Sequence, residues 1–93
     1  MGSFIAGDLA ALVAEETISL EKAVEMHLRS NHYPPLPYSM VQPALQAIEM
    51  YKAGEVNETI TLPEGMSYRD EPEMPVLTMI EVLHLEFFLP TEE

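Results

Sequence analysis

The segment YPPLPY (residues 33–38) constrains the fold of this chain more than any other stretch of the sequence. Each proline fixes its own φ angle and pushes the residue before it into extended geometry. The segment therefore cannot be helical, and it predicts about two turns of polyproline II at roughly three residues per turn. We expect it to form a rigid elbow between the helices on either side.

Two helices are expected before the elbow. In residues 7–17, GDLAALVAEET, Asp8 is a suitable N-cap and Leu9, Leu12 and Val13 fall on one face. Ser19 then caps a second helix, which we expect to stop at Asn31 in a left-handed conformation. The apolar stripe of this second helix consists of Leu20, Ala23, Val24, His27 and Leu28.

After the elbow, Ser39 and Gln42 match a capping box and Gly54 is a suitable stop, so residues 39–53 predict the most secure helix. Pro43 is tolerated in a first turn, which allows a start one or two residues later. Its apolar stripe consists of Val41, Ala44, Leu45, Ile48 and Tyr51. The alternating residues 58–62 predict a strand, with a turn at residues 63–65. Residues 66–74 look irregular, although residues 67–69 are candidates for brief pairing with that strand.

The apolar run VLTMIEVLHLEFFL (residues 76–89) is long for a strand, so we favour a helix that begins near Pro75. A helix of this length would turn Val76, Ile80, Leu83 and Phe87 inward. Together these patterns predict one small domain over residues 1–93. Its fold class is mainly α, a compact bundle of about four short helices with one short strand or hairpin.

The charge balance is the strongest indication of function. Sixteen acidic residues face four basic ones, which gives a formal net charge of −12. This imbalance excludes direct binding to nucleic acids and anionic membranes, because both require Lys and Arg. It exceeds the magnitude of about two to eight that solubility requires. A protein partner with a basic surface is therefore expected.

The sequence contains no cysteine, which excludes disulfides and thiolate chemistry. The N-terminus lacks the basic region of a signal peptide, and the apolar residues 4–13 are too few to span a bilayer. We therefore expect a cytoplasmic protein that is not bound to a membrane.

The histidines are the candidates for chemistry. His27 and His32 have a spacing that occurs in zinc sites, but no cysteine is present to complete such a site. His84, with Glu81 and Glu86 beside it, could add donors if the last helix folds over the second. An alternative function is therefore a small metal-dependent or hydrolytic enzyme that uses His27, His32, His84 and nearby glutamates. We favour histidines at the edge of the core, with no catalytic residue, no metal and no cofactor.

The elbow is interpreted first as architecture, with its tyrosines and leucine packed into the corner between helices. As a functional alternative, it is a preformed ligand for an aromatic groove in a partner. The acids Glu71 and Glu73 and the apolar Phe87 and Phe88 are further candidates for a binding surface. The candidate elbow residues are Tyr33, Pro34, Pro35, Leu36, Pro37 and Tyr38.

The motifs HLRSNHYPPLP, ITLPEGMSYR and HLEFFL, in this order from Ser19 onward, resemble a recurrent type of small orphan protein of actinobacterial phages. This type carries no activity that could be transferred to particular residues. The resemblance implies a phage accessory protein in the cytoplasm of a bacterial host, where such proteins commonly bind a host protein.

These observations predict a non-enzymatic interaction protein that binds, and in the sharpest form inhibits, a host protein through an acidic surface. The partner would then be a nucleic-acid enzyme, with the carboxylates imitating the phosphates of DNA. A further alternative is a homodimeric structural or regulatory component, built on the apolar residues at the C-terminal end.

Overall fold

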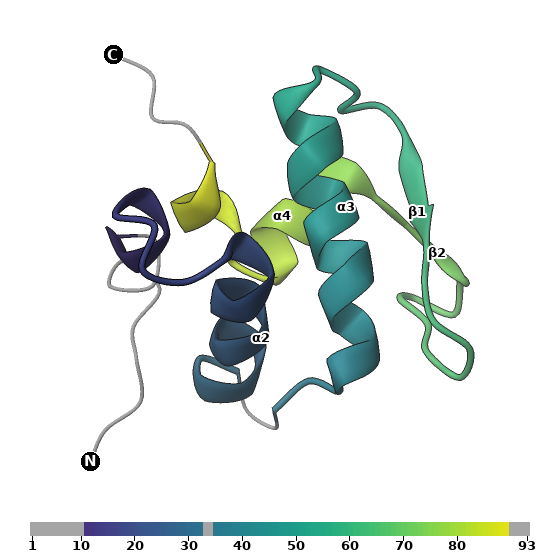
Figure 1. Ribbon diagram of the computed structural model, residues 1–93. Coiled ribbons are helices and arrows are strands. Elements are labelled where there is room, and N and C mark those ends of the chain that lie inside the picture. Colours follow the sequence, from purple (N-terminus) through teal and green to yellow (C-terminus); the bar gives the residue numbers. More distant parts are fainter. Residues whose placement is uncertain (1–10, 33–34, 90–93) are drawn as a thin grey trace.

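A computed structural model describes residues 11–32 and 35–89 (Figure 1). Residues 11–14 are helical, and Asp8 and Leu9, predicted for the start of this helix, lie outside the described residues. The fold is mainly α with a minor β-hairpin, as predicted from the sequence. Its further elements are α2 (Leu20–Ser30), η1 (Tyr38–Met40), α3 (Val41–Lys52), β1 (Thr59–Thr61), β2 (Glu73–Pro75), α4 (Val76–Val82) and η2 (Glu86–Phe88).

Helix α3 is the centre of the molecule. It packs against α2 and α4 on one side and against β1 on the other, so that it separates α2 from the hairpin (Figure 1). Ala44 and Ala47 of α3 are fully buried, and their small side chains let neighbouring elements approach closely. The larger buried side chains around them include Leu28, Ile48, Ile60, Met79 and Leu85.

Helix α2 follows its sequence signals at the N-terminus and departs from them at the C-terminus. The Ser19 hydroxyl accepts a hydrogen bond of 3.1 Å from the Lys22 backbone N–H, which confirms the predicted cap. The predicted stripe faces inward, with Ala23, Val24, His27 and Leu28 buried. The prediction for Asn31 is wrong, because this residue has φ −112° and ψ 15° and is not left-handed.

Helix α3 begins at Val41, a later start that Pro43 in its first turn allows, but it lacks the predicted capping box. Ser39 lies inside η1, and Met40, the actual N-cap, makes no capping bond with its side chain. The prediction fails because the Met40 backbone N–H bonds to the Pro37 carbonyl at 3.0 Å, which closes a 3₁₀ turn, and Met40 is buried. At the other end Gly54 has φ +83° and ends the helix as predicted.

The two strands form an antiparallel hairpin in which Ile60 lies opposite Met74. Both of these side chains are buried, while the residues on either side of each are exposed. The strand predicted at residues 58–62 is therefore confirmed with shorter bounds. Its predicted partner, residues 67–69, is wrong: Glu73–Pro75 pairs instead, and Tyr68 bridges to Glu71 within the loop. Acidic residues and prolines are rare in strands, so the local sequence did not predict Glu73–Pro75 as a strand.

The C-terminal run is helical, as predicted, but α4 ends at Val82 after seven residues. His84 adopts φ +57°, and the chain re-forms only one 3₁₀ turn, η2, behind it. This break changes the helical phase, so the prediction that Phe87 faces inward is wrong. Phe87 is 51% exposed, whereas Phe88 is 8% exposed and belongs to the core.

Candidate functional site

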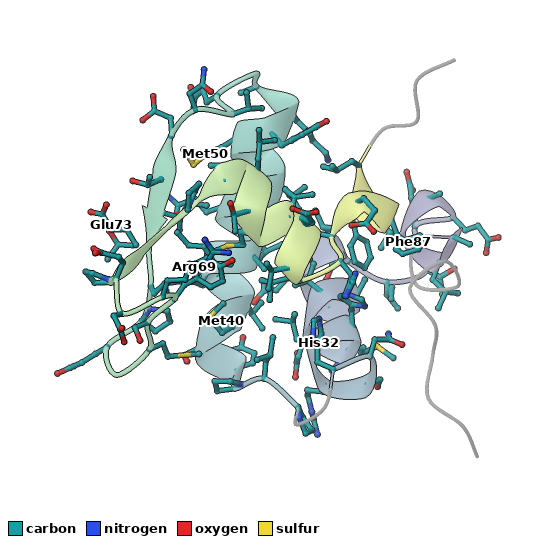
Figure 2. All side chains as sticks on the ribbon, turned by 180° about the vertical axis from the view of Figure 1, so that it is seen from behind. His32, Met40, Met50, Arg69, Glu73 and Phe87 are labelled. Carbon is teal, nitrogen blue, oxygen red and sulfur yellow. The ribbon has the colours of Figure 1, made fainter. Side chains whose placement is uncertain are left out.

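All three histidines of the chain gather at one place, although they come from separate segments. His27 is on α2, His32 follows α2, and His84 follows α4. The ring centroids of His27 and His32 lie 5.3 Å apart, and those of His32 and His84 lie 5.7 Å apart. Figure 2 labels His32 on the side of the molecule that also carries Phe87, away from Arg69 and Glu73. We call these three residues the histidine cluster.

The carbonyl oxygen of Leu83 joins the cluster to the end of α4. The Nε2 atoms of His27 and His32 lie 2.8 Å and 3.1 Å from this oxygen. Because a carbonyl only accepts hydrogen bonds, both imidazoles must carry their proton on Nε2 and donate it. Two histidine side chains therefore satisfy one carbonyl at a helix end, where such groups lack partners within the helix.

His27 is satisfied as a neutral ring. Its Nδ1 atom lies 3.1 Å from the Nδ2 atom of Asn31, an amide nitrogen that can only donate. Nδ1 must then be unprotonated, which agrees with Nε2–H donating to Leu83. His27 is also 1% exposed, and its ring meets that of Phe88 edge to face at 5.5 Å.

Burial lowers the pKa of His27 below its usual value of 6.5, because the charged ring would lose its hydration. The hydrogen bond to Leu83 opposes this shift, whereas His32 and His84 add to it by charge repulsion. No carboxylate of the described residues contributes to the shift. The electrostatics of the cluster therefore favour a neutral His27.

His84 stands at a position that usually belongs to glycine. The Leu85 N–H bonds to the Ile80 carbonyl at 2.9 Å and the His84 N–H to the Glu81 carbonyl at 3.3 Å. This pattern is a Schellman motif with His84 as its left-handed residue. A side chain in this conformation costs of order 1 kcal/mol, and such strain tends to gather at functional sites.

The cluster does not have the arrangement of a metal centre. Within residues 11–32 and 35–89, no group of three or more His, Asp or Glu side chains has the geometry to hold a metal ion. Both ring nitrogens of His27 are already used in hydrogen bonds, so it has no lone pair to offer without breaking one of them. The arrangement can instead bind and release protons.

A second candidate site lies on the hairpin side of the molecule. Glu71, Glu73 and Glu81 line an open hollow of about 350 Å³, together with Tyr68, Arg69, Pro75, Thr78 and Val82. We call this the acidic hollow. The Thr59 hydroxyl donates to Glu73 at 3.3 Å, and the Arg69 guanidinium lies 5.3 Å from the centre of the Tyr68 ring. Figure 2 shows Arg69 and Glu73 on this side of the molecule.

The structure separates the other predicted site residues. Tyr33 and Pro34 lie outside the described residues, while Pro35, Pro37 and Tyr38 are exposed and Leu36 is half-buried. The Tyr38 hydroxyl donates to Glu21 at 3.2 Å, and this bond raises the pKa of Tyr38. The Leu36 N–H bonds to the Leu28 carbonyl at 3.1 Å, which ties the elbow to the end of α2.

Phe87 and Phe88, predicted as a pair, have different environments. Phe88 is buried, so its side chain belongs to the core and not to an exposed surface. Phe87 contributes to an open groove of about 370 Å³, which Val13, Ala14, Leu20, Lys52, Phe88 and Leu89 also line. The two residues therefore line the same groove, but only Phe87 is exposed.

Sequence reasoning missed the role of Leu83 and left open whether the histidines meet, because this depends on the last helix folding over the second. The role of Leu83 cannot be predicted from its residue type, because its backbone carbonyl accepts the hydrogen bonds and its side chain does not. His27 on an apolar stripe was a usable signal, because a buried polar ring requires partners elsewhere in the fold.

No protein-family model, curated protein or solved structure matches the chain. Among the described residues, every helix is too short or too polar to cross a membrane.

Proposed function

We propose that this protein is a non-enzymatic interaction protein that binds a basic protein surface through its exposed carboxylates. The single observation that carries the proposal is how few of these carboxylates the fold neutralises. In the described part of the chain, both ion pairs use one acid, Glu25, which meets Lys22 at 3.8 Å and Arg29 at 3.5 Å. Glu25 is also the only described acidic residue that is half-buried, and the others are exposed.

Three of the four basic residues lie outside the acid-rich residues 55–73 and do not neutralise them. Two of these lie on α2 beside Glu25, and the third, Lys52, lines the open groove beside Phe87. Only Arg69 remains near the hairpin, where residues 55–73 contain six acidic residues. Uncompensated charge of one sign attracts partners of the opposite sign over long distances and speeds their encounter.

The acidic hollow is the part of this surface best suited to contact. It joins carboxylates from the hairpin loop, β2 and α4 with the aromatic ring of Tyr68 and the apolar side chain of Val82. Carboxylates beside an aromatic ring are suited to hold Lys or Arg side chains, by ion pairing and by cation–π contact. In its sharpest form, the proposal is a phage accessory protein that inhibits a nucleic-acid enzyme of its host.

The test is an affinity capture from an actinobacterial lysate, read by mass spectrometry at low and at high salt. We expect the protein to retain a basic partner at low salt and to release it at high salt, because salt screens exposed charges. A triple variant, Glu71→Gln, Glu73→Gln and Glu81→Gln, should lose this partner.

The matched control is the variant Glu15→Gln, Glu49→Gln and Glu86→Gln, which removes the same charge from exposed residues outside the hollow. It should keep most of the binding. Equal losses in both triple variants would show that only total charge matters and would contradict a site at the hollow. A partner that stays bound at high salt would contradict the electrostatic proposal itself.

A further inference from the structure

We propose that the histidine cluster is a pH-sensitive latch, which holds residues 83–89 against α2 while His27 is neutral and releases them on mild acidification. The inference does not depend on the acidic hollow, because the two sites share no residue.

The histidine cluster supplies contacts that hold residues 83–89 against α2. His27 and His32 both donate to the Leu83 carbonyl, and the His27 ring packs against Phe88. Leu85 and Phe88 are buried at 0% and 8% exposure, so the segment closes part of the core. Loss of the histidine contacts would therefore loosen a short 3₁₀ turn that has little hydrogen bonding of its own.

Protonation would break this arrangement at an identified atom. The added proton goes to Nδ1 of His27, where the amide of Asn31 now donates, so two donors would face each other. The ring would become a cation that is 1% exposed. Such a charge is costly to bury unless an anion pairs with it.

Among the described residues, the surroundings of His27 supply no such anion. Asn31 faces it from α2, Phe88 from η2 and the Leu83 carbonyl from the end of α4. The titratable groups that act on it are His32 and His84, and both lower the pKa of His27 by charge repulsion. Protonation of His27 in the closed state therefore meets this repulsion as well as the cost of burial, and opening relieves both.

The direction of the effect follows from the lowered pKa of His27. The open form has an ordinary histidine with a pKa near 6.5, so it binds more protons than the closed form below that pH. The closed form is then fully stable above about pH 6.5 and loses stability as the pH falls toward the lower pKa of the closed state.

Hydrogen exchange measured by NMR tests the latch, because protection factors correct for the intrinsic effect of pH on exchange. The reporting amides are those of Leu85, bonded to Ile80, and Phe88, bonded to Leu85. Between about pH 6.5 and 5.5 we expect their protection to fall up to about tenfold for each proton taken up on opening. The hairpin amides of Leu62 and Val76, bonded to Pro72 and Glu58, should keep theirs.

His27→Gln is the matched variant, since its amide can still donate to Leu83 but cannot take up a proton. It should abolish most of the pH-dependent fall. If this variant does not fold, His32→Gln should at least reduce the fall, because it removes a group that lowers the pKa of His27. Protection that is unchanged across this range, or that falls equally at the hairpin amides, would overturn the latch.

Discussion

At the scale of single residues, His84 is the clearest departure from what local sequence favours. Three segments of the chain end in the same hydrogen-bond pattern, with Glu16, Gly54 and His84 as the left-handed residue. Only Gly54 is free of steric cost there, because it has no Cβ atom. The chain therefore tolerates strain at His84, where the side chain reaches the histidine cluster.

Replacing His84 with glycine tests whether the backbone strain at this position costs more stability than the imidazole ring contributes. We expect His84→Gly to raise the free energy of unfolding by about 1 kcal/mol, since it relieves a left-handed side chain. Gly54→Ala, the reverse change at the equivalent position, should lower it by about 1 kcal/mol. Urea unfolding of both variants near pH 7.5 measures the two effects; a destabilised His84→Gly would mean that the ring contributes more than its strain costs.

At the scale of elements, the early end of α4 decides which C-terminal side chains are buried. A continuous helix through residues 76–89 would keep one face inward and would bury Phe87. The left-handed break at His84 rotates the chain, so that Leu85 and Phe88 enter the core instead. One left-handed residue thus changes which of the following side chains are buried in the core.

The neighbouring phenylalanines provide a direct test of this register. Phe88→Leu should lower the free energy of unfolding by about 1 to 2 kcal/mol, because it loses buried volume and the edge contact with His27. Phe87→Leu should change it by less than about 0.5 kcal/mol, as expected for an exposed side chain. Urea unfolding of both variants checks the assignment, which a larger effect at Phe87 would contradict.

At the scale of the whole molecule, net charge opposes compaction. A charge of −12 is held in a body with a radius of gyration of 13.0 Å. At about 10 mM salt the screening length is roughly 30 Å, so charges across the molecule repel one another. At about 150 mM it is roughly 8 Å, and only neighbouring charges interact.

The urea midpoint should therefore rise when NaCl is increased from about 10 mM to about 150 mM. The variant Glu71→Gln, Glu73→Gln and Glu81→Gln carries three fewer negative charges, so it should start from a higher midpoint and gain less from salt. A midpoint that does not depend on salt, in either protein, would show that self-repulsion contributes little to the stability of this fold.

Features that depend on a few neighbouring residues could be predicted from the sequence. The Ser19 cap, the stop at Gly54, the alternation around Ile60 and the helical nature of residues 76–82 are all confirmed. Each rests on backbone geometry or on periodicity within one element, which the sequence specifies directly. The mainly α fold class follows from the sum of such signals.

Features that depend on distant contacts could not be predicted in the same way. The pairing of Thr59–Thr61 with Glu73–Pro75, the end of α4 and the meeting of His27, His32 and His84 all belong to this group. The sequence by itself determined which segments are helical or extended and how strongly the molecule is charged, because these are local or additive properties. Only the tertiary structure decided that two histidines donate to one carbonyl with a third histidine beside them, because packing against α3 determines which segments become neighbours.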